Sequence, residues 1–274
     1  MKFKNLFAAL LAFCLFLPLT VSAKTQNISI QGDHGKLAAI LQTPDNQSRY
    51  PLVMLLHGFN VSKETKLLQE MAASLEAQGI ASIRFDFNGH GKSEGNFLQM
   101  TVPNEIEDAK KVFRYARSLP EVTTVSIGGH SQGGLVTAMT AGELGSQVKC
   151  IALMAPAAIL RDDFVRGKIF DAEFDPKNVP MTVKIFKKKR AVGRNYIKTM
   201  MNLPIYETAE KYNGPVCLVH SYSDTVIPYT DSLRFNHIYS NSELHLIEGL
   251  DHGFSPNQAE VVKIVTDFFV NHVK

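Results

Sequence analysis

A serine flanked by glycines is the first residue whose surroundings suggest chemistry. The stretch "VSIGGHSQGGLVTAM" leads from a β-branched run into Gly129-His130-Ser131-Gln132-Gly133, which fits the pattern G-x-S-x-G. In a sharp turn between a strand and a helix, such glycines let the neighbouring elements approach and leave the serine hydroxyl exposed at the top of a sheet. Because strand-like residues precede Ser131 and helix-like residues follow it, we predict that Ser131 is a nucleophile.

A nucleophilic serine needs a base to take its proton and an acid to orient that base. Of the nine histidines, His252 in "EGLDHGF" follows the last strand-like run, where a loop can reach back over Ser131. With a nucleophile on such a turn, the acid lies between the serine and the histidine in the chain. Asp224 in "SDTVIP" follows an apolar strand and is the predicted acid. Asp251 is the alternative, but it adjoins His252, and neighbours in a loop seldom point their side chains at each other.

Attack of a serine on a carbonyl creates an oxyanion, which backbone N–H groups must stabilise. One predicted donor is the amide of Gln132, because it lies at the start of a helix, where the helix dipole also favours negative charge. The second is expected after an early strand, where "LLHGFN" supplies the amide of Phe59 behind the tight turn that Gly58 permits. An ordinary turn is the alternative for this His-Gly pair.

Apolar runs of strand length alternate with helical periodicity along the chain. After "PLVMLLHG", apolar residues recur at spacings of three and four in residues 64–78, and a second such stripe follows Pro103. "IASIRFDF", "TTVSIGG", "VKCIALMAP", "GPVCLVHS" and "SELHLIEG" are further strand candidates, and residues 257–273 close the chain as a helix. Uniformly apolar strands separated by helices predict an α/β fold, with a mostly parallel central sheet and helices on both faces.

The segment between Pro156 and Pro215 interrupts this alternation. It contains no clear strand, several aromatics and the basic stretch "FKKKRAVGR", and connections between elements are usually far shorter. We interpret about residues 157–213 as an inserted lid over the carboxyl ends of the strands, where ligands bind in open α/β sheets. A disordered linker is the alternative, but it would expose many apolar side chains. The basic stretch is either a solvated face or a surface that attracts acidic polysaccharide.

Residues 1–23 are typical of a signal peptide. A basic start precedes an apolar stretch, and small residues end at Ala23, after which we expect cleavage. A retained membrane anchor is the alternative, but Pro18 interrupts the apolar stretch, which is shorter than the roughly 20 residues that span a bilayer. We therefore expect an exported protein, periplasmic or secreted, without a stable membrane anchor, in which residues 24–274 form one domain.

Composition excludes several other classes of protein. At 274 residues with 45% hydrophobic content, the chain is long enough for a large core. Loss of the two N-terminal lysines lowers Lys+Arg from 29 to 27 against 26 acids, so no global field that would attract nucleic acid remains. Cys150 and Cys217 lie in apolar runs and are expected as buried thiols, with a disulfide left open. No Cys or His cluster has metal-ligand spacing, and we expect neither a metal nor a cofactor.

The motifs "LLHGF", "RFDFNGHGKSEG", "GHSQGG", "SDTVIP" and "DHGF" stand in the order found in α/β-hydrolases, which the chain resembles over essentially all of residues 24–274. More narrowly, "GHSQGGLV", "MAPAA", "LPIYE", "PVCLVHSYSDTVIP" and "LHLIEGLDHGF" are similar to bacterial cinnamoyl (feruloyl) esterases, which cleave hydroxycinnamate esters and carry a short inserted lid. This resemblance implies that Asp163 and Tyr196 contact the hydroxyl of the phenolic ring. The stretch "KIFKKKRAVG" is more basic than the resemblance leads us to expect.

Together these observations predict a serine carboxylic-ester hydrolase that releases ferulic or p-coumaric acid through an acyl-enzyme. Its substrate would be a small-molecule or oligosaccharide ester. A short-chain esterase, a monoacylglycerol lipase and a serine peptidase are alternatives with the same three residues, and a binding protein on a hydrolase scaffold is the alternative from another class. The sequence leaves the oligomeric state open, a homodimer included.

Overall fold

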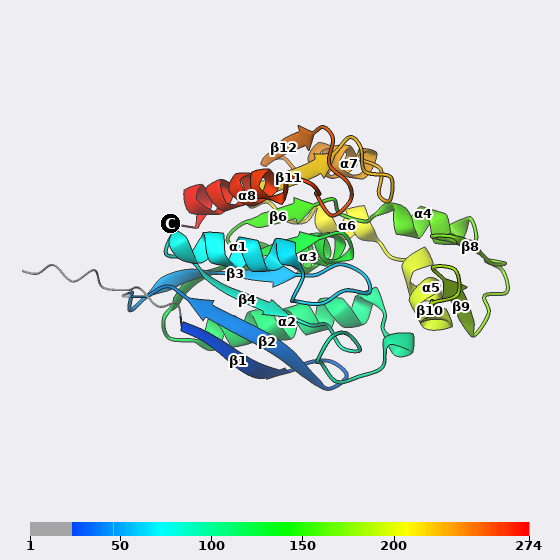
Figure 1. Cartoon of the computed structure of the whole chain (residues 1–274), viewed down its shortest axis with the longest axis horizontal. Coiled ribbons are helices and arrows are strands. Elements are labelled where there is room, and N and C mark those ends of the chain that lie inside the picture. Colours follow the sequence, from blue (N-terminus) through cyan, green and yellow to red (C-terminus); the bar gives the residue numbers. More distant parts are fainter. Residues whose placement is uncertain (1–23, 46, 274) are drawn as a thin grey trace, which may run out of the picture.

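The computed structural model describes residues 24–45 and 47–273, so the predicted signal peptide lies outside the described residues. An eight-stranded sheet in the order β1-β2-β4-β3-β5-β6-β11-β12 forms its centre. Strand β2 pairs antiparallel with both β1 and β4, and the remaining pairs are parallel (Figure 1). The strands are β1 (Lys24–Gln31), β2 (Lys36–Thr43), β3 (Tyr50–Leu56), β4 (Ala81–Phe85), β5 (Val122–His130), β6 (Ile151–Met154), β11 (Val216–Ser221) and β12 (Ser242–Ile247).

Helices cover both faces of this sheet (Figure 1). Successive residues of a strand point to opposite faces. In β3, Val53 and Leu55 therefore pack with the buried side chains of α1 and α8, whereas Leu52 and Met54 pack with those of α2 and α3. The doubly covered, mostly parallel sheet predicted from the apolar runs is confirmed. The main helices are α1 (Lys66–Ala77), α2 (Val102–Ser118), α3 (Gln132–Leu144), α7 (Thr230–Ile238) and α8 (Gln258–His272), and 3₁₀ turns are formed by η1 (Phe97–Gln99) and η2 (Gly145–Gln147).

Residues 155–215, here called the insertion, connect β6 to β11. The sequence shows no clear strand in this segment, but two antiparallel pairs of short strands form within it. Strands of two to four residues are too short to produce a readable alternation of polar and apolar residues. The elements are α4 (Ile159–Val165), β7 (Lys168–Ile169), β8 (Ala172–Glu173), β9 (Thr182–Ile185), β10 (Arg190–Gly193), α5 (Arg194–Met201) and α6 (Ile205–Ala209).

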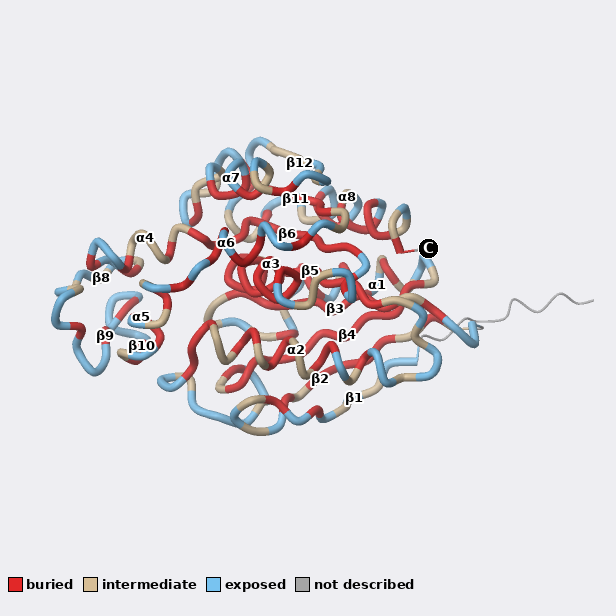
Figure 2. Tube along the Cα trace, turned by 180° about the vertical axis from the view of Figure 1, so that it is seen from behind, coloured by how far each residue is buried: buried red, intermediate tan, exposed pale blue. Residues whose placement is uncertain are grey.

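The insertion is folded and packs onto the core. It gathers at one end of the molecule, where its outer turns are exposed and the parts facing the sheet are buried (Figures 1 and 2). Ile169, Ile185 and Val192 belong to the same apolar cluster as the sheet and helix α3. The three lysines of the basic stretch lie in the exposed turn between β9 and β10, and the rest of the stretch continues into β10. This packing differs from the disordered linker considered as an alternative.

Two further observations concern the expected environment of the chain. Across residues 24–45 and 47–273, the structure contains no helix that is both long and apolar enough to cross a bilayer. Cys150 and Cys217 are both buried and carry free thiols.

Candidate active site

Ser131 lies in the turn between the end of β5 and the start of α3. Its backbone has φ of 58° and ψ of −122°, a left-handed conformation that is strained for a residue with a side chain. A Cβ on Gly129 would collide with the carbonyl oxygen of Gly133, and a Cβ on Gly133 would collide with the carbonyl oxygens of Leu56 and His57. The two glycines therefore allow α3 to start against the end of β3, and the turn between β5 and α3 presents Ser131 at the carboxyl edge of the sheet.

Ser131, His252 and Asp224 come together from three loops at that edge. The Ser131 Oγ lies 2.9 Å from His252 Nε2, and His252 Nδ1 lies 2.7 Å from Asp224 Oδ2. With the proton of the imidazole on Nδ1, Nε2 is free to accept the serine proton. This is the arrangement in which a histidine acts as the general base for a serine nucleophile.

The carboxylate of Asp224 is held by more than its contact with His252. Its Oδ1 accepts hydrogen bonds from the amides of Val226 and Ile227, at 2.8 and 2.9 Å, and His220 Nε2 lies 3.3 Å from Oδ2. Burial raises the pKa of Asp224, but the hydrogen bonds from His220 and His252 outweigh burial and hold the pKa below its usual range. Asp224 is therefore ionised at neutral pH, as a partner of an imidazolium must be.

Asp251, the alternative acid, bonds backbone amides of its own loop instead of His252. Its Oδ1 accepts hydrogen bonds from the amides of Gly253 and Ser255, at 2.9 and 2.8 Å. The carboxylate thus closes the turn that carries His252, and it points into its own loop rather than at the imidazole.

The loop after β3, which carries the predicted donor Phe59, runs directly beside Ser131. A Cβ on Gly58 would lie 3.0 Å from the Cβ of Ser131. The buried His57 holds this loop, because its Nδ1 bonds the Gly58 carbonyl at 2.8 Å and its Nε2 accepts from the Phe87 amide at 3.2 Å. Burial lowers the pKa of His57 to about 4, so this histidine is neutral at physiological pH.

A buried ion pair fixes the far end of the same loop. Lys63 Nζ lies 2.7 Å from Asp86 Oδ2, and the Lys63 amide donates to Asp86 Oδ1 at 2.7 Å. Both side chains are almost without solvent contact. The loop carrying Phe59 is therefore tied to the end of β4 as well as to its own strand.

The second predicted donor, Gln132, is the first residue of α3, and its N–H has no acceptor within the helix. Its side chain is buried and bonded at both ends. Nε2 donates to Glu105 Oε2 at 2.7 Å, and Oε1 accepts from the Tyr196 hydroxyl at 2.5 Å. Two backbone amides beside the nucleophile, here those predicted from Phe59 and Gln132, are the arrangement that stabilises a tetrahedral oxyanion.

Tyr196 differs from the expectation that it contacts substrate. Its side chain has no exposed surface, and its hydroxyl is already engaged by Gln132. The reason is local: α5 has one apolar face, which places Tyr196, Ile197 and Met200 against the core. Sequence position alone cannot separate a tyrosine that faces a ligand from one that packs beneath it.

A cavity of about 300 Å³ opens beside the nucleophile. Ser131, His252 and the start of helix α1 all line it. The space is large enough for part of a small organic substrate. Its lining residues are Gly58, Phe59, Val61, Thr65, Lys66, Leu67, His130, Ser131, His252, Gly253 and Gln258.

Asp163 and Phe170 line a separate cavity of about 350 Å³. Its carboxylate is one-third exposed and lies 3.8 Å from Arg166, and burial raises its pKa above the usual value. Thr225, which directly follows the triad acid, lines the same cavity. The ring of Phe170, which lines this cavity, packs 5.4 Å from that of Phe59, which lines the cavity beside Ser131. Tyr196 lines neither of these two cavities.

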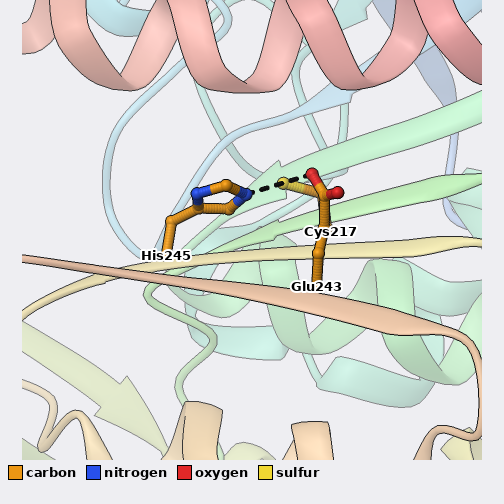
Figure 3. Close-up of side chains that lie close together, drawn as sticks. All are labelled: Cys217, Glu243 and His245. Carbon is orange, nitrogen blue, oxygen red and sulfur yellow. Dashed lines mark hydrogen bonds and ion pairs between the residues drawn. The ribbon is translucent and has the colours of Figure 1, made fainter.

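One group of described residues has the donor set of a metal site. Cys217 Sγ, a Glu243 carboxylate oxygen and a His245 ring nitrogen lie within 4.8 Å of one another (Figure 3). They come together through the pairing of β11 with β12, so no spacing within the sequence could reveal them. Burial raises the pKa of the Cys217 thiol well above its usual range, and His245 Nε2 bonds Glu243 at 3.0 Å instead. A protonated thiol is a poor ligand, and the group lies away from Ser131.

The fold and this geometry define a serine hydrolase with the α/β-hydrolase architecture. The model of the family described as "Serine aminopeptidase, S33" matches residues 47–190, and the chain belongs to this family of α/β-hydrolases. The matched segment contains Ser131 and both predicted oxyanion donors, and it ends within the insertion.

Solved structures give a narrower likeness. Est1E from Butyrivibrio proteoclasticus with ferulic acid bound is 30% identical, with a TM-score of 0.86, and the match covers 90% of this chain and 99% of that chain. The Pyrococcus furiosus esterase Pf2001 is 19% identical with a TM-score of 0.69, over 94% of this chain and 96% of that chain, and shows the fold alone. The resemblance to bacterial feruloyl esterases is thereby confirmed.

Among curated proteins, an uncharacterized 31.7 kDa protein from the traX-finO intergenic region of Escherichia coli is 30% identical over 139 residues. This match covers 50% of this chain, and the chain spans about half the length of that curated relative, 48%.

Proposed function

We propose that the protein is a serine carboxylic-ester hydrolase that releases hydroxycinnamic acids, such as ferulic and p-coumaric acid, from plant-derived esters. One observation carries this proposal: the continuous hydrogen-bonded chain Ser131–His252–Asp224. It lies in a protein that is similar over 90% of its length to Est1E, whose structure holds ferulic acid. Fold alone would not give a substrate, because the same architecture supports many reactions.

Acylation begins when Ser131 Oγ attacks the ester carbonyl carbon. The serine proton passes to His252 Nε2, and Asp224 stabilises the resulting imidazolium through Nδ1–H. The carbonyl oxygen becomes an oxyanion that the amides of Phe59 and Gln132 stabilise. When the tetrahedral intermediate collapses, the ester C–O bond breaks, and His252 gives its proton to the departing alkoxide. The alcohol leaves, and the acyl group remains on Ser131.

Deacylation repeats the same steps with water. His252 Nε2 takes a proton from the water, whose oxygen attacks the acyl carbonyl, and the same two amides stabilise the second oxyanion. Collapse breaks the bond to Ser131 Oγ, which recovers a proton from His252. The acid is released, and the enzyme returns to its starting state. Each step uses only this chain's own residues and water.

Recognition of the phenolic end is assigned to Asp163. A carboxylate can accept the proton of a phenol, and Asp163 lines a cavity beside the loop of the triad acid. A single substrate that reaches both Ser131 and Asp163 must span the two cavities, whose linings include the rings of Phe59 and Phe170, 5.4 Å apart. Phe170 has a left-handed φ of 51°, at the tip of the β7–β8 pair.

Hydrolysis of amino-terminal peptide bonds is the second candidate, favoured by the description of the matching family. Short-chain esterase and monoacylglycerol lipase activities need only the same triad and an apolar cavity. A binding protein without catalysis is disfavoured, because the nucleophile, base and acid are all in place and within hydrogen-bond distance.

A substrate panel separates these candidates. The proposal predicts that kcat/KM for ethyl ferulate and ethyl p-coumarate exceeds that for p-nitrophenyl butyrate, with no turnover of aminoacyl anilides. Ser131→Ala should remove nearly all activity and leave only a residual acceleration of about 10³- to 10⁴-fold over the uncatalysed reaction. Preference for butyrate far above ferulate would return the protein to general esterases, and preference for anilides would make it a peptidase.

We further propose export to the periplasm or the medium, on the strength of residues 1–23. The exported protein is then expected to begin at Lys24. Intact mass of protein recovered outside the cytoplasm, after expression of the full chain in a bacterial host, measures this start. A full-length product that pellets with membranes would refute both the cleavage site and the absence of an anchor.

A further inference from the structure

We infer that Tyr196 is a positioning residue that couples the insertion to the oxyanion hole, with Glu105 holding the other end of the same connection. This inference rests on the proposed ester hydrolysis at Ser131, but it holds for any ester substrate. It gives Tyr196 a role unlike that of a substrate contact.

A buried, hydrogen-bonded chain of three side chains from three helices supports this inference. Glu105 of α2 accepts from Gln132 of α3 at 2.7 Å, and Gln132 accepts from Tyr196 of α5 at 2.5 Å. The three residues are 2%, 1% and 0% exposed, so water does not compete for these bonds. The side chain of Gln132 is thus clamped between the core on one side and the insertion on the other.

The Tyr196 ring also contacts Phe59, the residue that supplies the other oxyanion donor. It stacks on Phe59 with centroids 5.7 Å apart and planes inclined by 28°. One side chain of the insertion therefore touches both residues whose amides form the oxyanion hole, one through its hydroxyl and the other through its ring.

Other aromatics reinforce this contact on the Phe59 side. The Phe59 ring lies 5.4 Å from Phe170 and 6.4 Å from Phe186, both in the insertion, and 5.5 Å from Phe97. Arg190 of β10 in turn lies over the Phe97 ring at 4.4 Å. If the insertion shifted, the loop carrying the Phe59 amide would lose most of its packing on that side.

The chemistry makes such positioning matter. Oxyanion donors act only when they lie about 2.7 to 3.1 Å from the place where the oxyanion will form. The two donors come from separate loops, after β3 and after β5, so no hydrogen bond of a single element fixes their separation. Tyr196 bridges the two residues. Removing its hydroxyl would also leave Gln132 Oε1 as a buried acceptor without a partner, which favours movement of that side chain.

Glu105 can hold Gln132 while its own carboxyl group is neutral. Its Oε2 accepts from Gln132, and its surroundings in α2 are buried, which raises its pKa to about 8. A neutral carboxyl offers the same acceptor as a glutamine amide. Glu105→Gln should therefore preserve the connection at pH 7, whereas Glu105→Leu should break it.

The test compares Tyr196→Phe with Tyr212→Phe on p-nitrophenyl butyrate and on ethyl ferulate. Tyr212 is the matched control, because it is also a buried tyrosine, and its hydroxyl bonds the Val148 carbonyl at 3.3 Å. For Tyr196→Phe we expect kcat to fall about tenfold on both esters, with KM within about twofold. Affinity for phenylboronic acid, which forms a tetrahedral adduct with the serine, should fall in parallel. Tyr212→Phe should leave all three unchanged.

The Glu105 pair gives an independent readout. Glu105→Leu should lower kcat as Tyr196→Phe does, and Glu105→Gln should restore it to within about twofold of the intact protein. If Tyr196→Phe does not fold, as judged by its melting transition, the Glu105 pair decides the matter. Failure of Glu105→Gln to restore kcat, with both variants folded, would contradict the connection.

Three results would overturn the inference. A loss confined to ethyl ferulate would make Tyr196 a substrate contact. A loss below twofold on both esters would leave the hydroxyl without a role in turnover, and an equal loss in Tyr212→Phe would reduce the effect to stability. The proposed function fails separately: intact protein that hydrolyses butyrate but not ferulate contradicts the substrate and leaves this comparison valid.

Discussion

The Nε2 of His130 lies 2.7 Å from the main-chain carbonyl oxygen of His252, so the residue before the nucleophile holds the loop that carries the base. The two rings lie 4.9 Å apart, and His130 also packs against Phe254. Burial, together with the nearby His252 ring, lowers the pKa of His130 to about 3, so it is a neutral donor at physiological pH. A histidine in the second position of G-x-S-x-G thus has a structural reason that its place in the motif does not reveal.

Replacing His130 by phenylalanine keeps a ring but removes this donor. We expect kcat to fall about tenfold, with KM little changed, because the loss of one buried hydrogen bond of about 1 kcal/mol lets the His252 loop move away from Ser131. Steady-state kinetics on p-nitrophenyl butyrate measures it, with the exposed His237→Phe as control. Unchanged kcat in His130→Phe would show that the loop is held by other contacts.

The assignment of the acid is tested by two single-atom changes. Asp224→Asn should lower kcat by about 10⁴-fold, because an amide facing Nδ1 favours the wrong tautomer of His252. Asp251→Asn keeps an oxygen that can accept from the amides of Gly253 and Ser255, so a loss of only a few-fold is expected. A large loss in Asp251→Asn beside a small one in Asp224→Asn would reverse the assignment.

The role of Asp163 is a matter of selectivity. Losing a hydrogen bond to the phenol typically costs about 1 to 3 kcal/mol, and plain cinnamate has no phenol to lose. Asp163→Ala should therefore lower kcat/KM for ethyl ferulate and ethyl p-coumarate, while ethyl cinnamate and p-nitrophenyl butyrate are hardly affected. Equal, small effects on all four esters would make Asp163 a surface residue. The neighbouring, more exposed Asp162→Ala is the matched control.

The contribution of Glu105 to stability is expected to fall as the pH rises from weakly acid to alkaline values. Burial raises the pKa of Glu105 to about 8 from its ordinary 4.5, so the folded protein holds this proton more tightly than the unfolded chain does. The resulting stabilisation is fully present below pH 4.5 and is lost as the pH rises through 8. Burial shifts the pKa of Asp108 and Asp231 upward in the same way, to about 6 and 7.

Glu105→Gln isolates one part of this dependence. Between pH 7 and 9, melting temperatures should fall less steeply in the variant than in the intact protein, because its amide does not titrate. The exposed Glu210→Gln should follow the intact protein. Parallel curves for Glu105→Gln and the intact protein would mean that Glu105 does not hold its proton through this range.

The residues of the proton relay were predictable because each follows a strand. Ser131, Asp224 and His252 all lie where an apolar run ends, and the carboxyl ends of parallel strands meet at one edge of the sheet. The same reasoning found the loop of Phe59. Apolar runs of five to nine residues were therefore enough to predict both the parallel sheet and the loops that surround the nucleophile.

The supporting residues could not be predicted, because their partners are distant in the chain. Glu105 and Gln132 are separated by 27 positions, and Gln132 and Tyr196 by 64. Tyr196 is the clearest case: a resemblance placed it at the substrate, and packing placed its hydroxyl on Gln132. Strands β1 and β2 were not predicted either, since β1 at the sheet edge is largely exposed and lacks an uninterrupted apolar run.

The most direct measurement of the central claim is the intact mass of protein quenched in acid during turnover of p-nitrophenyl ferulate. We expect one feruloyl group per chain, located by peptide mapping on Ser131, and none in Ser131→Ala. Release of ferulate without a covalent adduct, or an adduct on another residue that persists in Ser131→Ala, would contradict it.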